Sequence, residues 1–290
     1  MRTEELMTLD KTLSRMNSEL MLILFINEQF FLDHSDAINA NHDKLTDTIF
    51  MNNKYNKKFN ERNSRFFNIS ESSISIIFRS FYSYIFEAYK IYIENILYRS
   101  RDILKSSLVQ KNKEFELDFL FRVLGSDKES HMLTDEVDTL DYFRLRRNKI
   151  IHQSGEIQRE LKDIIEKKGL LLNKFWNNNK VVLKDLDFSS LSVTKLSELE
   201  IIDVIRIIRR ICSKIDEAVL SRIPRDVIIQ YVLTDFKKDH IDKIKKLKQS
   251  EKRIKGMFCR ILEQKFNLVI TEHELSGLDF TLPESDKKTT

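Results

Sequence analysis

The scarcity of glycine and proline constrains the fold of this chain more than any other feature. The 290 residues hold only five glycines and two prolines. Sheet proteins use both residues in their turns, so a barrel or a sandwich is not expected. Neither G-x-G-x-x-G nor G-K-S/T occurs, which argues against dinucleotide-binding and P-loop enzymes. With 41% hydrophobic and 32% charged residues, the composition is typical of long amphipathic helices, and we predict an all-α fold.

Neither the overall charge nor the cysteine content indicates a particular binding partner or metal. Lys and Arg number 49 and Asp and Glu 45, a net charge of +4, which does not by itself demand nucleic acid. Two cysteines are too few for a disulfide framework or a cysteine zinc site. The start, MRTEEL, has no apolar signal core, and the longest apolar run, Leu20 to Ile26, is too short to span a membrane. We therefore expect a soluble, cytoplasmic protein with no membrane partner.

Apolar side chains three and four residues apart, together with capping residues, predict a series of helices. We expect them over residues 4–33, 36–65 (broken or continuous), 71–104, 106–124, 134–154, 156–168, 196–222 and 237–265. Thr3 is the expected N-cap of the first helix and Gly169 the expected C-cap of helix 156–168. Pro224 fits the first turn of a further helix. Val181 to Leu183 give the one strand or hairpin signal.

One stretch, YFRLRRNKIIHQSG from Tyr142 to Gly155, combines residue types that cleave phosphodiesters. Such a reaction needs a group that moves a proton, for which His152 has the right pKa range, and a cation that holds the charged phosphorane. On a helix Asn148 and His152 share a face, and Arg147 lies about 140° around from His152. The alternative is a basic surface helix with one incidental histidine. The stretch is free of acids up to Gln153 and its cations are Arg144, Arg146, Arg147 and Lys149.

The hexapeptide from Arg147 through Asn148 to His152 resembles the Arg-Asn-x-x-x-His signature of HEPN domains. An earlier aromatic-rich helix, SFYSYIFEAYKIYIENIL, carries the acidic residue Glu87, as that family commonly does. The later order of a short helix, a small hairpin insert and a long helix also resembles the family. The resemblance covers residues 70–222. It divides the chain into a helical N-terminal extension, 1–69, a HEPN-like helical domain, 70–222, and a basic helical C-terminal extension, 223–290, whose tail after Gly277 is expected to be disordered.

The resemblance implies a metal-independent endoribonuclease without a cofactor, acting as an antiphage-defence effector or toxin. Such proteins dimerise so that two motif helices face a shared cleft, and attack by the RNA 2′-OH leaves a 2′,3′-cyclic phosphate. Carried over, His152 is the acid/base group, Arg147 binds phosphate, Asn148 orients the site and Glu87 holds Arg147. The alternative for Glu87 is pairing with some other cation. The implied partners are RNA, a second copy of the chain, and an antitoxin or sensor protein.

One departure from the family pattern concerns regulation. HEPN toxins silenced by a partner nucleotidyltransferase usually carry Tyr two residues after the motif histidine, where this chain has Ser154. Control by adenylylation of that tyrosine is therefore not expected.

Further basic residues are candidate RNA contacts. On the helix 196–222, the arginines either line the cleft or pair with Glu200 and Asp203. Residues 237–260 hold ten basic residues against three acids, and a solvated helix face is favoured over an RNA track there because few aromatic residues are interleaved. The candidate RNA contacts are Arg144, Arg146, Lys149, Arg206, Arg209 and Arg210. The other histidines show no metal-binding spacing, so no metal site is expected; they are His34, His42, His131, His240 and His273.

Two rival functions stay open at the level of sequence. The first is a non-catalytic HEPN-like module that binds nucleic acid, nucleotide or a protein partner. The second is a structural helical scaffold, which leaves the stretch from Tyr142 to Gly155 unexplained. Catalysis and binding differ at His152, because an RNase needs a titrating imidazole and a binder needs only positive charge.

Overall fold

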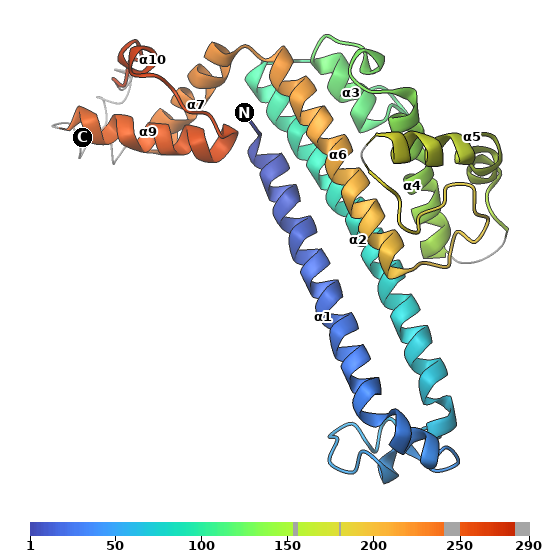
Figure 1. The fold of residues 1–290 in the computed structure, drawn as a ribbon. Helices are drawn as coiled ribbons and strands as arrows, with labels where there is room; N and C mark the ends of the chain where they lie inside the picture. The colour runs from blue at the N-terminus through green and yellow to red at the C-terminus, as the bar shows by residue number, and fades with distance from the viewer. Residues whose placement is uncertain (153–155, 180, 241–249, 282–290) are drawn as a thin grey trace. The chain divides into compact units, whose positions relative to one another are not determined.

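A computed structural model describes residues 1–152, 156–179, 181–240 and 250–281. The described residues form an all-α fold, as predicted, with no strand and a single isolated bridge between Leu45 and Arg62. The α-helices within these residues are α1 (Glu4–Ala40), α2 (Phe66–Ile103), α3 (Glu116–Val123), α4 (Thr134–His152), α5 (Arg159–Asn178), α6 (Glu198–Arg222), α7 (Arg225–Asp239), α9 (Glu251–Phe266) and α10 (Glu272–Ser276) (Figure 1).

The chain divides into two compact units, each built from segments that are distant in sequence. Unit 1 comprises Met1–Asp10, Tyr89–Leu133 and Arg210–Thr290, and unit 2 comprises Lys11–Ala88 and Thr134–Arg209. The boundaries between the units fall inside α1, α2 and α6, so each of these helices contributes residues to both units.

Unit 1 contains a buried polar network at the start of α1. The hydroxyl of Thr3 accepts from Leu6 N at 3.2 Å, which confirms the predicted N-cap. The carboxylate of Asp216 accepts from both the backbone N and the hydroxyl of Thr3. In the same unit α2 and α6 run side by side (Figure 1), and the Tyr92 hydroxyl donates to the Cys212 carbonyl at 3.1 Å. These bonds satisfy polar groups that burial would otherwise leave unpaired.

Unit 2 is organised around helices α4 and α5, which pack against each other. Trp176 is fully buried, and its indole N–H donates to the Thr139 hydroxyl at 2.9 Å. The ring of Phe188, from the segment after α5, lies 4.8 Å from the ring of Tyr142 on α4. This core fixes the orientation of α4 and therefore decides which of its side chains are buried.

Gly169 does not cap a helix, and the predicted end of α5 is wrong. The helix continues through Gly169 to Asn178. A Cβ atom at Gly169 would lie 2.6 Å from the carbonyl oxygen of Phe188 and 2.6 Å from the Cα of Ser189. The glycine therefore allows a backbone segment to cross the helix at close range. Nothing in the sequence around Gly169 indicates this contact, because the crossing segment lies about 20 residues later in the chain.

The predicted hairpin after α5 is also wrong. The described residues between Asn178 and Glu198 contain no strand, and side chains hold this segment as an irregular loop. Asp203 Oδ2 accepts the backbone N–H groups of Lys184, Asp185 and Leu186 at 2.7, 3.0 and 3.2 Å. Lys180, inside the predicted hairpin, lies outside the described residues.

Several other helix predictions need correction. Residues 41–65 form a loop with two short 3₁₀ turns rather than a helix, and the segment before Glu116 in the predicted helix 106–124 is mostly irregular. Pro224 is the N-cap of α7 and not a first-turn residue. Within the predicted helix 237–265, α7 ends at Asp239 and α9 begins at Glu251; residues 241–249 lie outside the described residues, as does the tail from 282 onward.

Candidate functional site: the open face of helix α4

Helix α4 presents two faces of different character. Its buried residues Tyr142, Leu145, Arg146, Lys149 and Ile150 are spaced three and four apart, so they share one side of the helix. The side chains on the other side are half-buried or exposed, and we call this side the open face. Its members are Arg144, Arg147, Asn148, Ile151 and His152. The open face therefore carries the three residues of the predicted motif.

Arg146 lies in the core, so its predicted contact with RNA is wrong. Its guanidinium donates to Val193 O at 2.8 Å, to the Tyr142 hydroxyl at 3.2 Å and to the carboxylate of Glu200. It also lies 5.4 Å from the centre of the Tyr82 ring. Only 3% of the Arg146 side chain is exposed, which leaves no surface for a phosphate.

The environment of Arg146 explains why a charge is tolerated there. Burial alone would lower the pKa of Arg146, but electrostatic interactions with Tyr142, Tyr82 and Glu200 raise it above its usual value, so the guanidinium stays charged. Burial in turn raises the pKa of Glu200, although Arg146 opposes that shift. Lys149 is buried on the same face and engaged with other groups, so its predicted role as an RNA contact is wrong for the same reason.

Arg147 and Glu87 form the pair that the resemblance implies. Arg147 Nη2 lies 3.7 Å from Glu87 Oε2, and 31% and 44% of the two side chains are exposed. Among the described residues, the buried Nε of Arg147 has no hydrogen-bond partner. A guanidinium that is partly exposed and oriented by one carboxylate can take a phosphate oxygen on its exposed side.

His152 is exposed at the carboxyl end of α4, and Asn148, one turn earlier, is half-buried. Both therefore project from the open face, as the helical spacing predicted. Ser154 and Gly155, which follow the motif, lie outside the described residues. The structure thus places Arg147, Asn148 and His152 on the open face of α4, and Arg147 lies beside the Glu87 carboxylate.

The three arginines of α6 differ in their surroundings. Arg206 donates to Asp203 at 3.3 Å and to Val182 O at 2.9 Å, which is the pairing weighed as the alternative to a cleft. Arg209 donates to the Ser14 hydroxyl at 2.7 Å. Arg210 is exposed. Of these, only the Arg210 side chain is left largely in solvent, and Arg206 serves the loop before α6.

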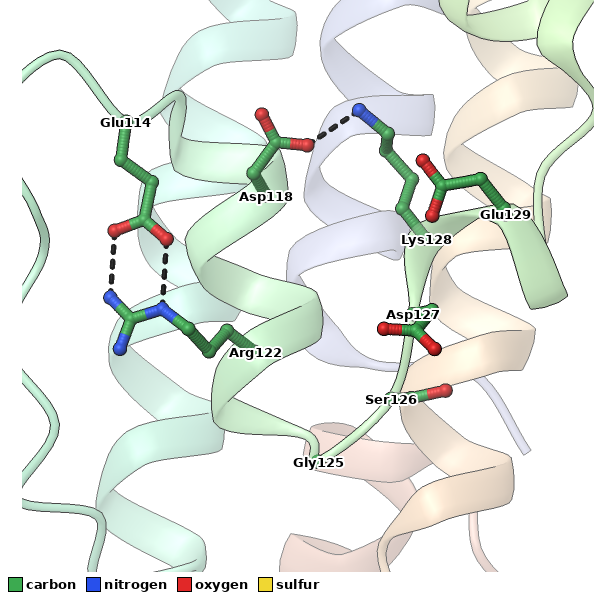
Figure 2. Close-up of a pocket in the computed structure, with 8 residues that line it drawn as sticks. All are labelled: Glu114, Asp118, Arg122, Gly125, Ser126, Asp127, Lys128 and Glu129. Atoms are coloured by element: carbon green, nitrogen blue, oxygen red, sulfur yellow. Dashed lines mark hydrogen bonds and ion pairs between the residues drawn. The ribbon is translucent and has the colours of Figure 1, made fainter.

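Two pockets in the described residues are lined by none of the predicted site residues. The first, in unit 1, has a volume of about 370 Å³. Figure 2 shows that its cations face its acids: Arg122 donates to both Glu114 oxygens, and Lys128 lies 2.5 Å from Asp118. Arg122 lowers the pKa of Glu114 to about 2. The second pocket, in unit 2, has a volume of about 720 Å³ and lies between α1, α2 and residues 195–196.

No protein-family model, no curated protein and no solved structure matches this chain. Among the described residues, no helix has the length and apolar character to cross a membrane. The same residues contain no group of three or more His, Cys, Asp or Glu side chains placed to hold a metal ion. The evidence for the candidate site therefore comes from the geometry of this chain and not from a known relative.

The buried polar cluster formed by Arg146, Tyr82 and Glu200 was not predicted from the sequence. A signal was available, because Arg146 follows Tyr142 by four residues and precedes Ile150 by four, on the side that carries Leu145. The clamp made by Asp203 had no comparable signal, since its three backbone donors come from a loop 17 to 19 residues away.

Proposed function

We propose that this protein is an endoribonuclease of the HEPN type, acting as a defence effector or toxin, and that the open face of α4 is its active site. The observation that carries the proposal is the Glu87–Arg147 pair on the same face that ends in an exposed His152. Glu87 lies beside the guanidinium and orients it, and 31% of the Arg147 side chain stays exposed. The imidazole is free to reach a substrate, because it lies at the end of the helix and in solvent.

The reaction follows from these groups. A base removes the proton of an RNA 2′-OH, the 2′-oxygen attacks the adjacent phosphorus, and the bond from phosphorus to the 5′-oxygen breaks. An acid returns a proton to the departing 5′-oxygen, and the other product carries a 2′,3′-cyclic phosphate. His152 serves as one of the two proton-transfer groups, and Arg147 stabilises the additional negative charge on the phosphorane. Asn148 orients the imidazole or donates to the phosphate.

The chain offers one motif histidine, whereas this reaction uses both an acid and a base. A two-fold dimer supplies the second imidazole from the other copy, because an isologous interface presents the same surface twice. The proposed active unit is therefore a homodimer in which two open faces share one cleft. An antitoxin or a sensor protein is the proposed means of keeping such an activity silent.

The decisive experiment compares cleavage of single-stranded RNA by the wild type and by His152→Ala in excess EDTA. Loss of a general acid/base group lowers the rate about 10²–10⁴-fold. His273, exposed on α10, provides the matched control, and His273→Ala should cut at the wild-type rate. Products should end in cyclic phosphate, and replacing the attacking ribose by deoxyribose should abolish cleavage.

The rival function, a non-catalytic binding module, predicts a different result in this experiment. Such a module binds RNA in both the wild type and His152→Ala and cuts it in neither. Unchanged cleavage in His152→Ala, or EDTA-sensitive cleavage that leaves 3′-OH ends, would also contradict the proposal. Growth after induced expression gives the cellular readout, since only the wild type should be toxic.

A further inference from the structure

The loop between α1 and α2, residues 41–65, is long but held in a defined shape; we call it the α1–α2 loop (Figure 1). Its neck is closed by Thr46, whose backbone N donates to Glu61 O and whose hydroxyl donates to Phe59 O, both at 2.8 Å. Asn63, fully buried, completes the neck. Long loops without strands or extended helices are uncommon in compact proteins and are usually functional when they are ordered.

Aromatic rings fix the α1–α2 loop to the helices below it. Phe50 lies 5.5 Å from Phe30 of α1 and 5.9 Å from Phe66 of α2, measured between ring centres. Phe59 meets Phe66 edge to face at 5.9 Å. These contacts hold the two sides of the loop in place, so a ligand that binds its outer part need not order the backbone first.

The outer part of the loop is positively charged. Lys54, Lys57 and Lys58 are exposed, and no acidic residue occurs between Asp47 and Glu61. In the described part of the chain, none of these three lysines takes part in an ion pair. Most exposed lysines on helix α5 differ in this respect, because Lys162 and Lys167 pair with acids one turn away.

Exposed aromatic rings are interleaved with these lysines. Tyr55 is 56% exposed and Phe59 is 39% exposed, so both rings are accessible from solvent. Lys54 Nζ lies 4.9 Å from the centre of the Tyr55 ring. Ammonium groups beside accessible rings are the combination with which proteins hold the phosphates and bases of an unpaired strand.

We infer that the α1–α2 loop is a binding site for single-stranded nucleic acid. The lysines contact consecutive phosphates, and Tyr55 and Phe59 stack on bases. The inference goes beyond the proposed function, because the loop would hold a strand whether or not the open face of α4 cleaves it.

An anionic membrane surface would also attract exposed lysines and rings, but the loop is poorly suited to lipid. Its outer part carries several asparagine side chains, and an amide that enters lipid loses its hydrogen bonds to water at a cost of about 2 kcal/mol or more. The same amides can donate to phosphates and base edges. The asparagines of the outer loop are Asn52, Asn53, Asn56 and Asn60.

The first test measures binding of the full-length chain carrying His152→Ala, which prevents cleavage, to fluorescent 12-nucleotide RNA and DNA by anisotropy. The triple variant Lys54→Ala/Lys57→Ala/Lys58→Ala should bind both single strands more weakly. Three lost phosphate contacts should reduce the slope of log Kd against log salt concentration by about 2. The matched control, Lys162→Ala/Lys167→Ala/Lys174→Ala, removes the same charge from exposed positions of α5 and should change the slope little.

The second test separates stacking from charge. Tyr55→Ala should raise Kd about fivefold or more, and Tyr55→Phe, which keeps the ring, should bind like the parent chain. Equal losses in the two tyrosine variants, or a lysine triple no weaker than its α5 control, would overturn the inference. So would lysine-dependent binding to vesicles containing phosphatidylserine that is tighter than binding to either strand.

Discussion

Asp216 shows how strongly one buried carboxyl can link the stability of unit 1 to pH. The residue is 1% exposed, and its partner Thr3 supplies two hydrogen bonds. Burial raises the pKa of Asp216 from 3.8 to about 6, although the bonds from Thr3 lower it and Glu5 adds to the increase. The folded state therefore holds the Asp216 proton more tightly than the unfolded chain does.

The sign of the resulting pH dependence follows from that difference. As the pH falls from 7 through the folded-state pKa, the folded protein takes up the proton first and is stabilised. Between pH 7 and pH 5 the free energy of unfolding should gain about 1 kcal/mol from this residue. Urea unfolding at the two pH values should show this gain in the wild type and not in Asp216→Asn. An identical pH dependence in both chains would contradict the assignment.

Arg146 and Arg147 show how far the site could be predicted from single residues. The motif spacing predicted that Asn148 and His152 share a face of a helix, and both are accessible on the open face, with Arg147 farther around the same side. The resemblance implied Glu87 as the partner of Arg147, and the two side chains form an ion pair. The same charge pattern wrongly assigned Arg146 to the surface. A run of basic residues does not show which of them is buried, because burial depends on the direction in which each side chain leaves the helix. Neighbouring residues such as Arg146 and Arg147 differ in that direction by about 100°.

At the scale of elements, α5 contains the clearest test of a close backbone contact. An exposed Gly→Ala substitution inside a helix usually stabilises by about 1 kcal/mol. Gly169→Ala should instead destabilise by about 1–3 kcal/mol, because its Cβ would overlap the backbone at Phe188. Gly256 of α9 is the matched control, since a Cβ there meets nothing within 4 Å. Thermal unfolding should show opposite signs for the two variants, and equal signs would disprove the contact.

The long helices could be predicted because their apolar residues repeat at helical spacing over many turns. Where the secondary structure was predicted wrongly, the sequence has no such repeating pattern. Residues 181–183 have the apolar, mostly β-branched composition of a strand, yet the described residues contain no strand with which they could pair. Asp203 holds the adjacent backbone instead. Residues 41–65 read as helix, but the bonds of Thr46 and Asn63 across the loop neck override that weak preference.

At the scale of the whole molecule, the proposed activity depends on a second copy of the chain. Helix α2 leaves Tyr84, Ile91 and Tyr98 exposed at intervals of seven residues, so they share one side of that helix. Exposed apolar residues in such a row are typical of an interface between proteins. Glu87, which pairs with Arg147, lies between the first two of them in sequence.

Mixing experiments test whether the two copies share one active site. If both His152 side chains act on each bond, an equal mixture of wild type and His152→Ala should retain about a quarter of the wild-type activity, because only wild-type pairs are active. Independent sites would retain about half. Light scattering at micromolar concentration should report a dimer, and a fully active monomer would rule out the shared site while leaving the assignment of Arg147 and His152 intact.

The two units are built from alternating segments of the sequence, and this order has a consequence for biosynthesis. Thr3 bonds to Asp216, and the first ten residues belong to the unit that contains the chain beyond residue 209. Domains built from one continuous segment fold as they leave the ribosome, one after another. Here the N-terminal residues must wait until more than two hundred further residues have been translated. A translation product that stops before Arg209 therefore lacks parts of both units. For a protein with the proposed toxicity, such an incomplete product should be harmless.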